Sequence, residues 1–352
     1  MSRILVEGFR NLASWNISQG RQLSISSPFV ISNSDTDFGG QYYLTINDNS
    51  YSSVISRAIK SSSEIYIGFW LKTIYGLSSN DSLITLKSGA TPLAVLYAEG
   101  NSFQQGIHFG YISSGSIVNL IGFYEANYAY AEALVHIQFY YKPHYTNGAC
   151  AIKINDHLVD SASGIKTCDY SDARSVDLIE LGYNSLPEHK IAGLIADDAS
   201  WPGTTYVMSH IPSTPGNYTQ FTPIPSSEFN YGIMDNLDFS RLSGTTRPLE
   251  DENMTETSAA SAIDTFGHDD ISCHVSTILS VSNDFACERR GNISLRTMQS
   301  VIRINGEDHF SDDIDARSNP PGQHILETNP ETGERFTEQE VNDLETGYKV
   351  KE

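Results

Sequence analysis

The chain of 352 residues is 39% hydrophobic and 11% aromatic, which is enough apolar material for packed cores and argues against a disordered protein. Its formal net charge of −21 repels phosphate backbones and anionic lipid, so the composition argues against nucleic-acid binding and membrane docking. No segment approaches the roughly 18 apolar residues of a membrane span, and we expect no membrane insertion.

The negative charge is concentrated late in the chain. Up to residue 205, 18 Asp and Glu residues against 12 Lys and Arg residues give −6; from residue 206 onward, 25 against 10 give −15. We interpret this surface as acidic and solubilising. The beginning, "MSRILVEGFRNLASW", is charged at Arg3 and Glu7 and has no long apolar run, so it predicts no signal peptide and synthesis in a cytoplasm.

Short strands separated by turn residues are predicted through the first two thirds of the chain. "QLSISSPFVIS" and "GGQYYLTIN" are rich in β-branched and aromatic residues, and similar stretches follow at the spacing typical of a sandwich or barrel. In "SEIYIGFWLKTIY" the apolar residues 65, 67, 69 and 71 share one face of a strand, whereas Trp70 falls on the other. We therefore expect both faces of this strand to be covered.

The stretch "ALVHIQFYYKPHYTNGACAIKINDHLVDSASG" predicts three antiparallel strands. Thr146-Asn147-Gly148 and Asn155-Asp156 carry turn residues between alternating apolar ones, and they predict the two reversals. Together with "VDLIELGYN" and "KIAGLIADDASW", this stretch resembles the concanavalin A-like, laminin-G-type jelly roll over residues 1–222. The resemblance implies a curved antiparallel sheet packed on a flatter one.

Residues 223–352 are predicted to form a smaller C-terminal β-sandwich. Its strands are expected in "CHVSTILSVSNDFAC", "GNISLRTMQSVIRINGEDHF" and "GQHILETNP". The ending "ETNPETGERFTEQEVNDLETGYKV" resembles the terminal signature of phage virion proteins that couple a lectin-like domain to a C-terminal β-domain. This chain has Phe336 where that signature usually has Trp.

The same ending predicts one short helix at residues 337–346. Thr337 and Glu340 have the spacing of a capping box, with Phe336 placed for a hydrophobic staple. Gly347 is predicted to stop the helix, and the residues after it can return as a strand. Because so short a helix is unstable alone, we expect it to pack on the second β-domain.

No catalytic motif is found in the sequence. Glycoside hydrolases of the jelly-roll fold need two carboxylates about 5–5.5 Å apart, and no such paired string occurs. Asp177 and Glu180 are three apart on a strand, so we expect them on opposite faces. The sequence therefore favours a protein that is not an enzyme, with a glycoside hydrolase as a remote alternative.

Two kinds of binding residue are candidates. The resemblance implies calcium on loop oxygens, and Asp35, Asp37 and Asp48 lie in oxygen-rich turns, where they either bind the ion or hydrogen-bond their own backbone. The aromatic side chains are Tyr124, Tyr128, Tyr130 and Tyr145. At an exposed tip they would stack on a sugar, and otherwise they belong to a core or a subunit contact.

The four cysteines lack metal-binding spacing. Cys150 and Cys168 flank one predicted hairpin, and Cys273 and Cys287 are placed to flank another. A disulfide in each pair and free buried thiols both fit the spacing, and cytoplasmic synthesis favours the thiols.

The resemblance makes the leading hypothesis a non-enzymatic virion structural protein, tail-associated or capsid-decorating. It implies a homo-oligomer whose partners are other virion proteins and whose location is the virion. The alternative is a carbohydrate-binding module for host adsorption, whose partner is a surface glycan. The two roles can coexist in one tail-tip protein.

Overall fold

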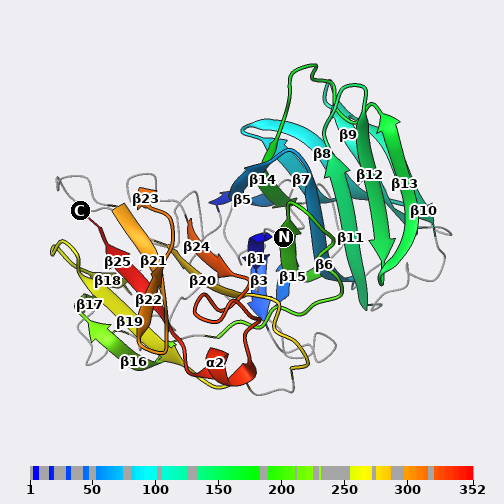
Figure 1. Cartoon of the computed structure of the whole chain (residues 1–352). Helices are drawn as coiled ribbons and strands as arrows, with labels where there is room; N and C mark the ends of the chain where they lie inside the picture. The colour runs from blue at the N-terminus through cyan, green and yellow to red at the C-terminus, as the bar shows by residue number, and fades with distance from the viewer. Residues whose placement is uncertain are drawn as a thin grey trace. The chain divides into compact units, whose positions relative to one another are not determined.

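The computed structural model of the chain describes residues 3–7, 16–19, 29–32, 43–46, 53–73, 81–100, 105–124, 134–182, 189–210, 212–224, 230, 254–271, 275–286, 297–315 and 321–351 (Figure 1). The described residues form two compact units, of which the first extends to Ser209 and the second begins at His210. Among the described residues, no helix is long and apolar enough to cross a membrane.

The first unit consists of two antiparallel sheets. One contains β1 (Arg3–Glu7), β3 (Phe29–Ser32), β4 (Tyr43–Ile46), β6 (Ile65–Thr73), β11 (Leu134–Lys142), β12 (Gly148–Ile154), β13 (His157–Ile165) and β15 (His189–Asp197). The other contains β2 (Asn16–Gln19), β5 (Ser53–Ser62), β7 (Asp81–Ser88), β8 (Thr91–Gly100), β9 (Gln105–Ser113), β10 (Ser116–Tyr124) and β14 (Val176–Gly182).

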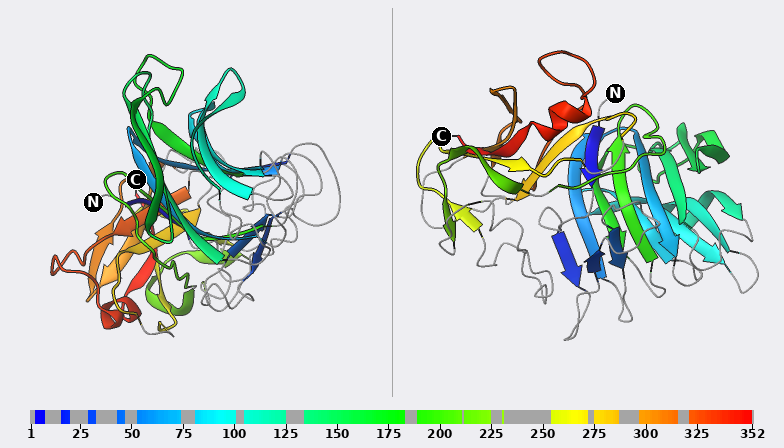
Figure 2. Two further views of the ribbon diagram at one scale, coloured as in Figure 1. Left: turned by 90° about the vertical axis from the view of Figure 1, so that its right-hand side faces the viewer. Right: turned by 90° about the horizontal axis from the view of Figure 1, so that it is seen from below.

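The strand orders are β13-β12-β11-β6-β15-β4-β3, with β1 also pairing with β15, and β10-β9-β8-β7-β14-β5-β2. Figure 2 shows the two layers facing each other. This arrangement confirms the predicted all-β jelly-roll sandwich.

The core of the first unit lies between these two sheets. Phe109 of β9 contacts Phe139 and Tyr141 of β11, with ring centroids 5.4 and 5.3 Å apart. Burying a ring of this kind stabilises the fold by about 1.5–3 kcal/mol. The predicted alternation in β6 is confirmed, because residues 65, 67, 69 and 71 are buried in this core.

Both predicted reversals between β11, β12 and β13 are present. Asn155 and Asp156 have φ angles of 48° and 66°, the left-handed pair that a two-residue hairpin turn requires. In the turn before β12, the Nδ1 atom of His144 accepts hydrogen bonds from the backbone N–H groups of Thr146 and Asn147 at 3.1 and 2.8 Å.

The second unit contains β16 (Pro212–Thr219), β17 (Thr222–Ile224), β18 (Met254–Glu256), β19 (Ile263–His268), β20 (Val281–Ala286), β21 (Thr297–Ile304), β22 (Glu307–Phe310), β23 (Ile314–Asp315), β24 (Pro321–Leu326), α2 (Glu338–Asn342) and β25 (Glu345–Val350). Its main sheet has the order β16-β19-β25-β21-β22, and β23 also pairs with β21. Two smaller sheets pair β17 with β18 and β20 with β24.

The division between the units differs from the predicted boundary at residue 222. Strand β16 pairs with β19, and this pairing places residues 212–219 in the sheet of the second unit. The sequence assigned them to the first domain because a proline-rich exit follows them. Their backbone pairing with β19 assigns them to the second unit, and this long-range pairing cannot be read from the local sequence pattern.

Helix α2 is shorter than the predicted helix at 337–346. Its capping box is present: Thr337 accepts a hydrogen bond from the backbone N–H of Glu340, and the Glu340 side chain accepts one from the backbone N–H of Thr337. Phe336 and Leu344, which flank the helix, are buried with Ile302 of β21, and Val341 of the helix packs against the same cluster, so the helix packs on the sheet as expected.

Gly347 does not stop the helix, which ends at Asn342. It lies inside β25, where a Cβ atom would be 1.9 Å from the carbonyl oxygen of Asp264 in β19. The glycine is required by the close approach of two central strands. A helix-stop signal and a strand glycine look the same in a single sequence.

We predict that Gly347→Ala lowers the unfolding free energy of the second unit by about 3 kcal/mol, because the added methyl group forces β19 and β25 apart. Denaturant unfolding of the full chain measures the change. Lys349→Ala, on the partly exposed side of the same strand, is the control and is expected to change stability by about 0.5 kcal/mol. Equal stability of Gly347→Ala and the wild type would contradict the close approach.

Candidate functional site

The outer face of the eight-stranded sheet carries aromatic side chains at regular positions. Along β6 and β11 the residues facing away from the core are those that alternate with the buried apolar ones. Strand register pairs Tyr140 with Tyr66 and His136 with Trp70. Between these pairs, Gln138 lies opposite Gly68. The face therefore has an aromatic pair at each end and a flat polar centre.

Residues 198–206, which we call the strap, cross this centre after β15. The Oδ1 atom of Asp197 accepts hydrogen bonds from the backbone N–H groups of Ala199 and Ser200 at 2.9 and 3.1 Å, and this turns the chain. A Cβ at Gly68 would lie 3.4 Å from the ring of Pro202. This distance is an ordinary van der Waals contact, so the strap lies directly over Gly68.

Polar contacts hold the strap at its centre. Gln138 accepts a hydrogen bond from the backbone N–H of Gly203 at 3.0 Å and donates one to the Oδ1 atom of Asp156 at 2.6 Å. The Thr204 hydroxyl donates to the other oxygen of the same carboxylate. The turn between β12 and β13 therefore supplies an acceptor that fixes both the sheet and the strap.

At one end of the strap, Trp201 joins a cluster of aromatic rings. The rings of Tyr66 and Tyr140 are stacked with centroids 4.5 Å apart, and Trp201 meets Tyr66 edge-on at 5.4 Å. The Tyr140 hydroxyl donates to the Oε2 atom of Glu64 at 2.8 Å, and the ammonium group of Lys153 lies 4.2 Å from the Trp201 centroid. The three rings are partly exposed.

At the other end, Tyr206 lies on Trp70. Their centroids are 5.2 Å apart and their planes are inclined by only 21°. The Trp70 indole N–H donates to the carbonyl oxygen of Thr205 at 2.8 Å, which fixes the position of the strap next to this stack. Trp70 is 8% exposed, whereas Tyr206 is 56% exposed. One ring is therefore the support and the other presents a free surface to solvent.

We use the name aromatic face for Tyr66, Trp70, Tyr140, Trp201 and Tyr206 together. Burial and the hydrogen bond to Glu64 raise the pKa of Tyr140 well above its ordinary value, so its hydroxyl remains a donor. Burial alone would raise the pKa of Asp156, but the hydrogen bonds from Thr204 and Gln138 outweigh it and lower that pKa overall. The carboxylate of Asp156 is therefore ionised at neutral pH.

His136 is a buried titratable group on this face. It is 1% exposed, and its ring centroid lies 4.9 Å from that of Trp70. Burial lowers the pKa of His136 to about 4, although the nearby Asp156 opposes this shift. Among the described residues, its Nδ1 atom has no hydrogen-bond partner. The imidazole is therefore neutral in the folded protein at neutral pH.

The outer face of the seven-stranded sheet is less accessible in the part that the structure describes. Tyr97 and His108 are paired across β8 and β9, and they are only 3% and 1% exposed. Lys87 forms an ion pair with Glu180, and Asp177 accepts a hydrogen bond from the backbone N–H of Gly89. Both carboxylates of "VDLIELG" therefore have separate structural partners.

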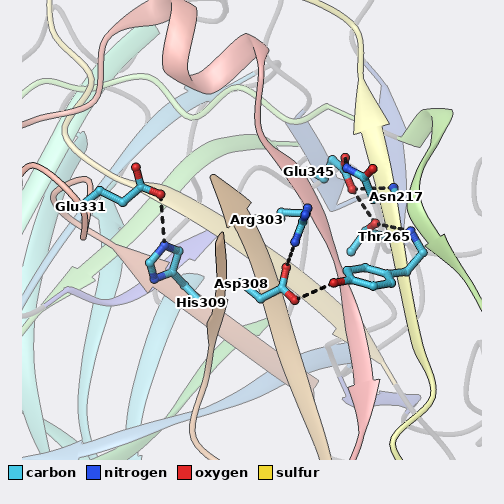
Figure 3. Close-up of polar contacts among 8 residues, drawn as sticks. Asn217, Thr265, Arg303, Asp308, His309, Glu331 and Glu345 are labelled. Carbon is cyan, nitrogen blue, oxygen red and sulfur yellow. Dashed lines mark hydrogen bonds and ion pairs between the residues drawn. The ribbon is translucent and has the colours of Figure 1, made fainter. Parts of the chain in front are cut away.

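In the second unit, a polar cluster lies on the main sheet (Figure 3). The Oε2 atom of Glu345 accepts hydrogen bonds from the backbone N–H of Asn217 at 2.8 Å and from the Thr265 hydroxyl at 2.5 Å. A Cβ at Gly216 would lie 2.4 Å from that hydroxyl oxygen. This part of the cluster joins β16 to β19 and β25.

The other part of the cluster is a set of mutually paired charges (Figure 3). Arg303 forms an ion pair with Asp308, which also accepts a hydrogen bond from the Tyr218 hydroxyl at 3.2 Å. His309 and Glu331 approach to 3.9 Å. The polar groups of the cluster bind one another, so we interpret it as a structural clamp on β16 and β22.

Of the residues predicted from sequence to bind a ligand, only Tyr145 is described with its side chain, and it is not one of the five residues of the aromatic face. Tyr145 is 43% exposed in the connection between β11 and β12, with the ammonium of Lys166 4.8 Å from its ring centroid. Tyr124 ends β10, and the structure describes its backbone only. Outside the described residues lie Tyr128, Tyr130, Asp35, Asp37 and Asp48.

Sequence reasoning missed all five residues of the aromatic face as site residues: Tyr66, Trp70, Tyr140, Trp201 and Tyr206. The alternation in β6 already placed Tyr66 on the same face as Trp70, so this signal could have found it. Trp201 and Tyr206 lie in a stretch that has no periodicity. Only contacts with residues distant in the sequence identify them: Trp201 meets Tyr66, and Tyr206 meets Trp70.

No group of three His, Cys, Asp or Glu side chains that could hold a metal ion is found among the described residues. Cys150 and Cys168 are buried free thiols, and burial raises the pKa of Cys150 to about 12. The other two cysteines, Cys273 and Cys287, lie outside the described residues.

No protein-family model and no curated protein sequence matches the chain. Among solved structures, the cellulose-induced protein Cip1 is 12% identical with a TM-score of 0.40, covering 58% of this chain and 99% of its own. The β-glucanase of Bacillus licheniformis is 11% identical with a TM-score of 0.35, covering 55% and 97%.

A carbohydrate esterase from the Shiga toxin-encoding bacteriophage phi24B is 15% identical with a TM-score of 0.36, covering 53% of this chain and 91% of its own. At such low identities and TM-scores, these similarities assign no activity to this chain. The function has to be inferred from the site itself.

We predict that His136 makes the first unit less stable in acid. Its folded-state pKa of about 4 lies below the unfolded value of about 6.5, so the unfolded chain takes up a proton more readily. The free energy of unfolding therefore has its full value above a pH of about 6.5 and decreases as the pH falls towards 4. The difference of about 2.5 pKa units corresponds to about 3 kcal/mol.

Denaturant unfolding at a series of pH values measures this loss, and His136→Phe is the matched variant because it keeps an aromatic ring beside Trp70. The variant is expected to lack the part of the pH dependence that His136 causes. If the free energy of unfolding changes equally with pH in both proteins between pH 6.5 and pH 4, the pKa of His136 is not lowered in the folded state.

Proposed function

We propose that the first unit binds a glycan on its aromatic face without catalysing a reaction. The observation that carries this proposal is Tyr206, whose ring is 56% exposed and rests almost parallel on the buried Trp70. An exposed aromatic ring that is held in place offers a flat apolar surface on which a sugar ring can stack.

The apolar C–H face of a pyranose ring packs well against a flat aromatic side chain. Stacking on Trp70 and the hydrogen bond between Trp70 and Thr205 hold Tyr206 before any ligand arrives. Little side-chain entropy is then lost on binding. Trp201, at the other end of the strap, provides a second ring. Two separated rings suit an extended chain of sugars.

Polar groups beside the rings supply hydrogen-bond acceptors for sugar hydroxyls. The carboxylates of Glu64 and Asp156 already accept one or more hydrogen bonds from the protein and retain further lone pairs. A glycosidase needs one carboxyl group with a raised pKa to protonate the leaving group. The pKa of Asp156 is lowered instead, which supports binding without catalysis.

We predict that Tyr206→Ala weakens glycan binding about 10-fold or more, because removing a central aromatic side chain from a binding surface costs about 1–2 kcal/mol. A glycan array identifies ligands of the full chain, and isothermal titration calorimetry then compares the variants. Trp201→Ala is expected to act in the same direction.

The matched control is Phe310→Ala, which removes a partly exposed ring from β22 in the second unit. It should leave glycan binding unchanged. If Tyr145→Ala weakens glycan binding and Tyr206→Ala does not, the binding site lies at the connection between β11 and β12. Absence of binding by the wild-type chain to every glycan tested would refute the proposal.

A second candidate function is the virion structural protein that the sequence resemblance implies. It is favoured by the closing stretch, because the residues that carry the resemblance also build the second unit. Phe336 and Leu344 are buried against β21, and Asn329 is buried and donates a hydrogen bond to the Glu340 side chain at 2.8 Å. In this role the chain assembles as a homo-oligomer with other virion proteins.

If this second candidate is right, purified phage particles contain the chain in stoichiometric amounts. Quantitative mass spectrometry of particles that have been purified on a density gradient measures its copy number against the major capsid protein. Unassembled protein from the same lysate serves as the control for contamination. Particles that infect normally and lack the chain would exclude this role.

A further inference from the structure

The strap lies along β6, and its residues follow those of the strand in order. The ring of Trp201 meets the ring of Tyr66 at 5.4 Å, and the ring of Pro202 lies over Gly68, two positions further along β6. After another two positions of the strand, Tyr206 stacks on the indole ring there at 5.2 Å. The two aromatic ends of the face are therefore separated by a fixed number of strand residues.

Strand geometry sets the distance between these two ends. Residues 66 and 70 of β6 lie about 13 Å apart, because a strand rises about 3.3 Å per residue. The strap covers the same interval between Trp201 and Tyr206 in five residue steps, which reach at most about 18 Å. Between them it is attached by the hydrogen bond from the backbone N–H of Gly203 to Gln138 at 3.0 Å. The separation of the two ends is thus set before any ligand binds.

Small or buried residues form the strap between the two ends. Gly203 has a φ angle of 75°, and a Cβ atom there would meet no atom of the described residues within 4 Å. Thr204 is exposed, and its hydroxyl donates a hydrogen bond to Asp156 while keeping its acceptor lone pairs. Pro202 is buried, and Thr205 is partly buried. A bound chain can therefore pass from one aromatic end to the other over the strap, because no large exposed strap side chain stands between them.

The length of a sugar unit determines how many units fit this interval. With bonds of about 1.5 Å, one pyranose unit of an extended chain is about 5 Å long. A disaccharide therefore reaches one aromatic end only. A chain of four units covers the whole interval of about 13 Å, so that its terminal units stack at both ends. The second stacking contact is then formed within the same complex, and this raises the affinity over that of either contact alone.

We infer that the aromatic face binds linear glycan chains of at least four pyranose units, which lie along β6 with one unit on Tyr206 and another on the partly exposed rings around Trp201. This inference rests on the proposed glycan-binding function and adds the length and the direction of the ligand to it. Shorter sugars, and branched glycans whose linear arms are shorter than the interval, contact one end only and bind weakly.

The test measures affinity as a function of chain length. Linear oligomers of glucose, mannose, xylose, N-acetylglucosamine and galacturonate, each from two to six units long, are titrated into the full chain by isothermal titration calorimetry. In the series that binds, we expect the tetrasaccharide to bind at least about 10-fold more tightly than the disaccharide, because it gains the second aromatic contact. The hexasaccharide should bind at most about 3-fold more tightly than the tetrasaccharide, since further units reach no additional ring.

Two variants then test whether the gain with length comes from the two ends. Trp201→Ala and Tyr206→Ala each leave one aromatic end, so the ratio between tetrasaccharide and disaccharide affinity should fall below about 3-fold in either variant. Phe310→Ala is the matched control, because it removes an aromatic ring from the second unit and should leave the ratio unchanged. Thermal unfolding is compared for all variants, and the length series of the wild type tests the inference independently of any variant.

Each outcome has a separate meaning. A disaccharide that binds the wild type as tightly as the hexasaccharide would overturn the inference while leaving glycan binding intact. A steady rise in affinity from four to six units would also overturn it, because the site would then extend beyond the two aromatic ends. The same holds if the ratio stays unchanged in folded Trp201→Ala and Tyr206→Ala. Failure of every oligosaccharide to bind would instead refute the proposed function itself.

Discussion

The pairing of β6 with β11 determines the rest of the first unit. These two strands have a hydrophobic core on one side and an aromatic surface on the other. Their register pairs apolar residues on the core side and aromatic residues on the outer side. Phe139 and Ile67 meet across the core side, and Tyr140 and Tyr66 meet across the outer side. A shift by one residue would exchange the two faces and bury polar groups such as Gln138 among apolar side chains.

The strap follows from the same pairing. It crosses the sheet over Gly68, and it is attached there through Gln138. Once it is attached, Trp201 and Tyr206 are placed next to the aromatic pairs at the two ends. The arrangement of the site is thus a consequence of strand register, and no separate element is needed to position the rings.

Local patterns in the sequence predicted the elements that short-range physics controls. The alternation of β6, the left-handed pair Asn155-Asp156 and the capping box of Thr337 and Glu340 each depend on residues within a few positions of one another. All three are present in the structure, and the jelly-roll class follows from the number and spacing of such strands.

Features controlled by distant partners could not be predicted in this way. Gly347 was interpreted as the end of a helix, whereas its neighbour in space is Asp264 in another strand. Strand β16 joined the second unit through pairing with β19. The strap has a composition typical of a loop, and its order depends on Trp70, which is 135 positions from Thr205. A single sequence does not show which residues that are far apart along the chain lie next to each other in the fold.

The alternation along β6 and β11 has a consequence for how the surface can change over time. Every outward-facing residue of these strands has an even number, and the core residues between them have odd numbers. Substitutions at positions 66 and 140 therefore alter the surface without removing a side chain from the core between the sheets, whereas Trp70 and His136 are buried on that side. The partly exposed rings can vary between related chains while the packing of the sandwich is conserved.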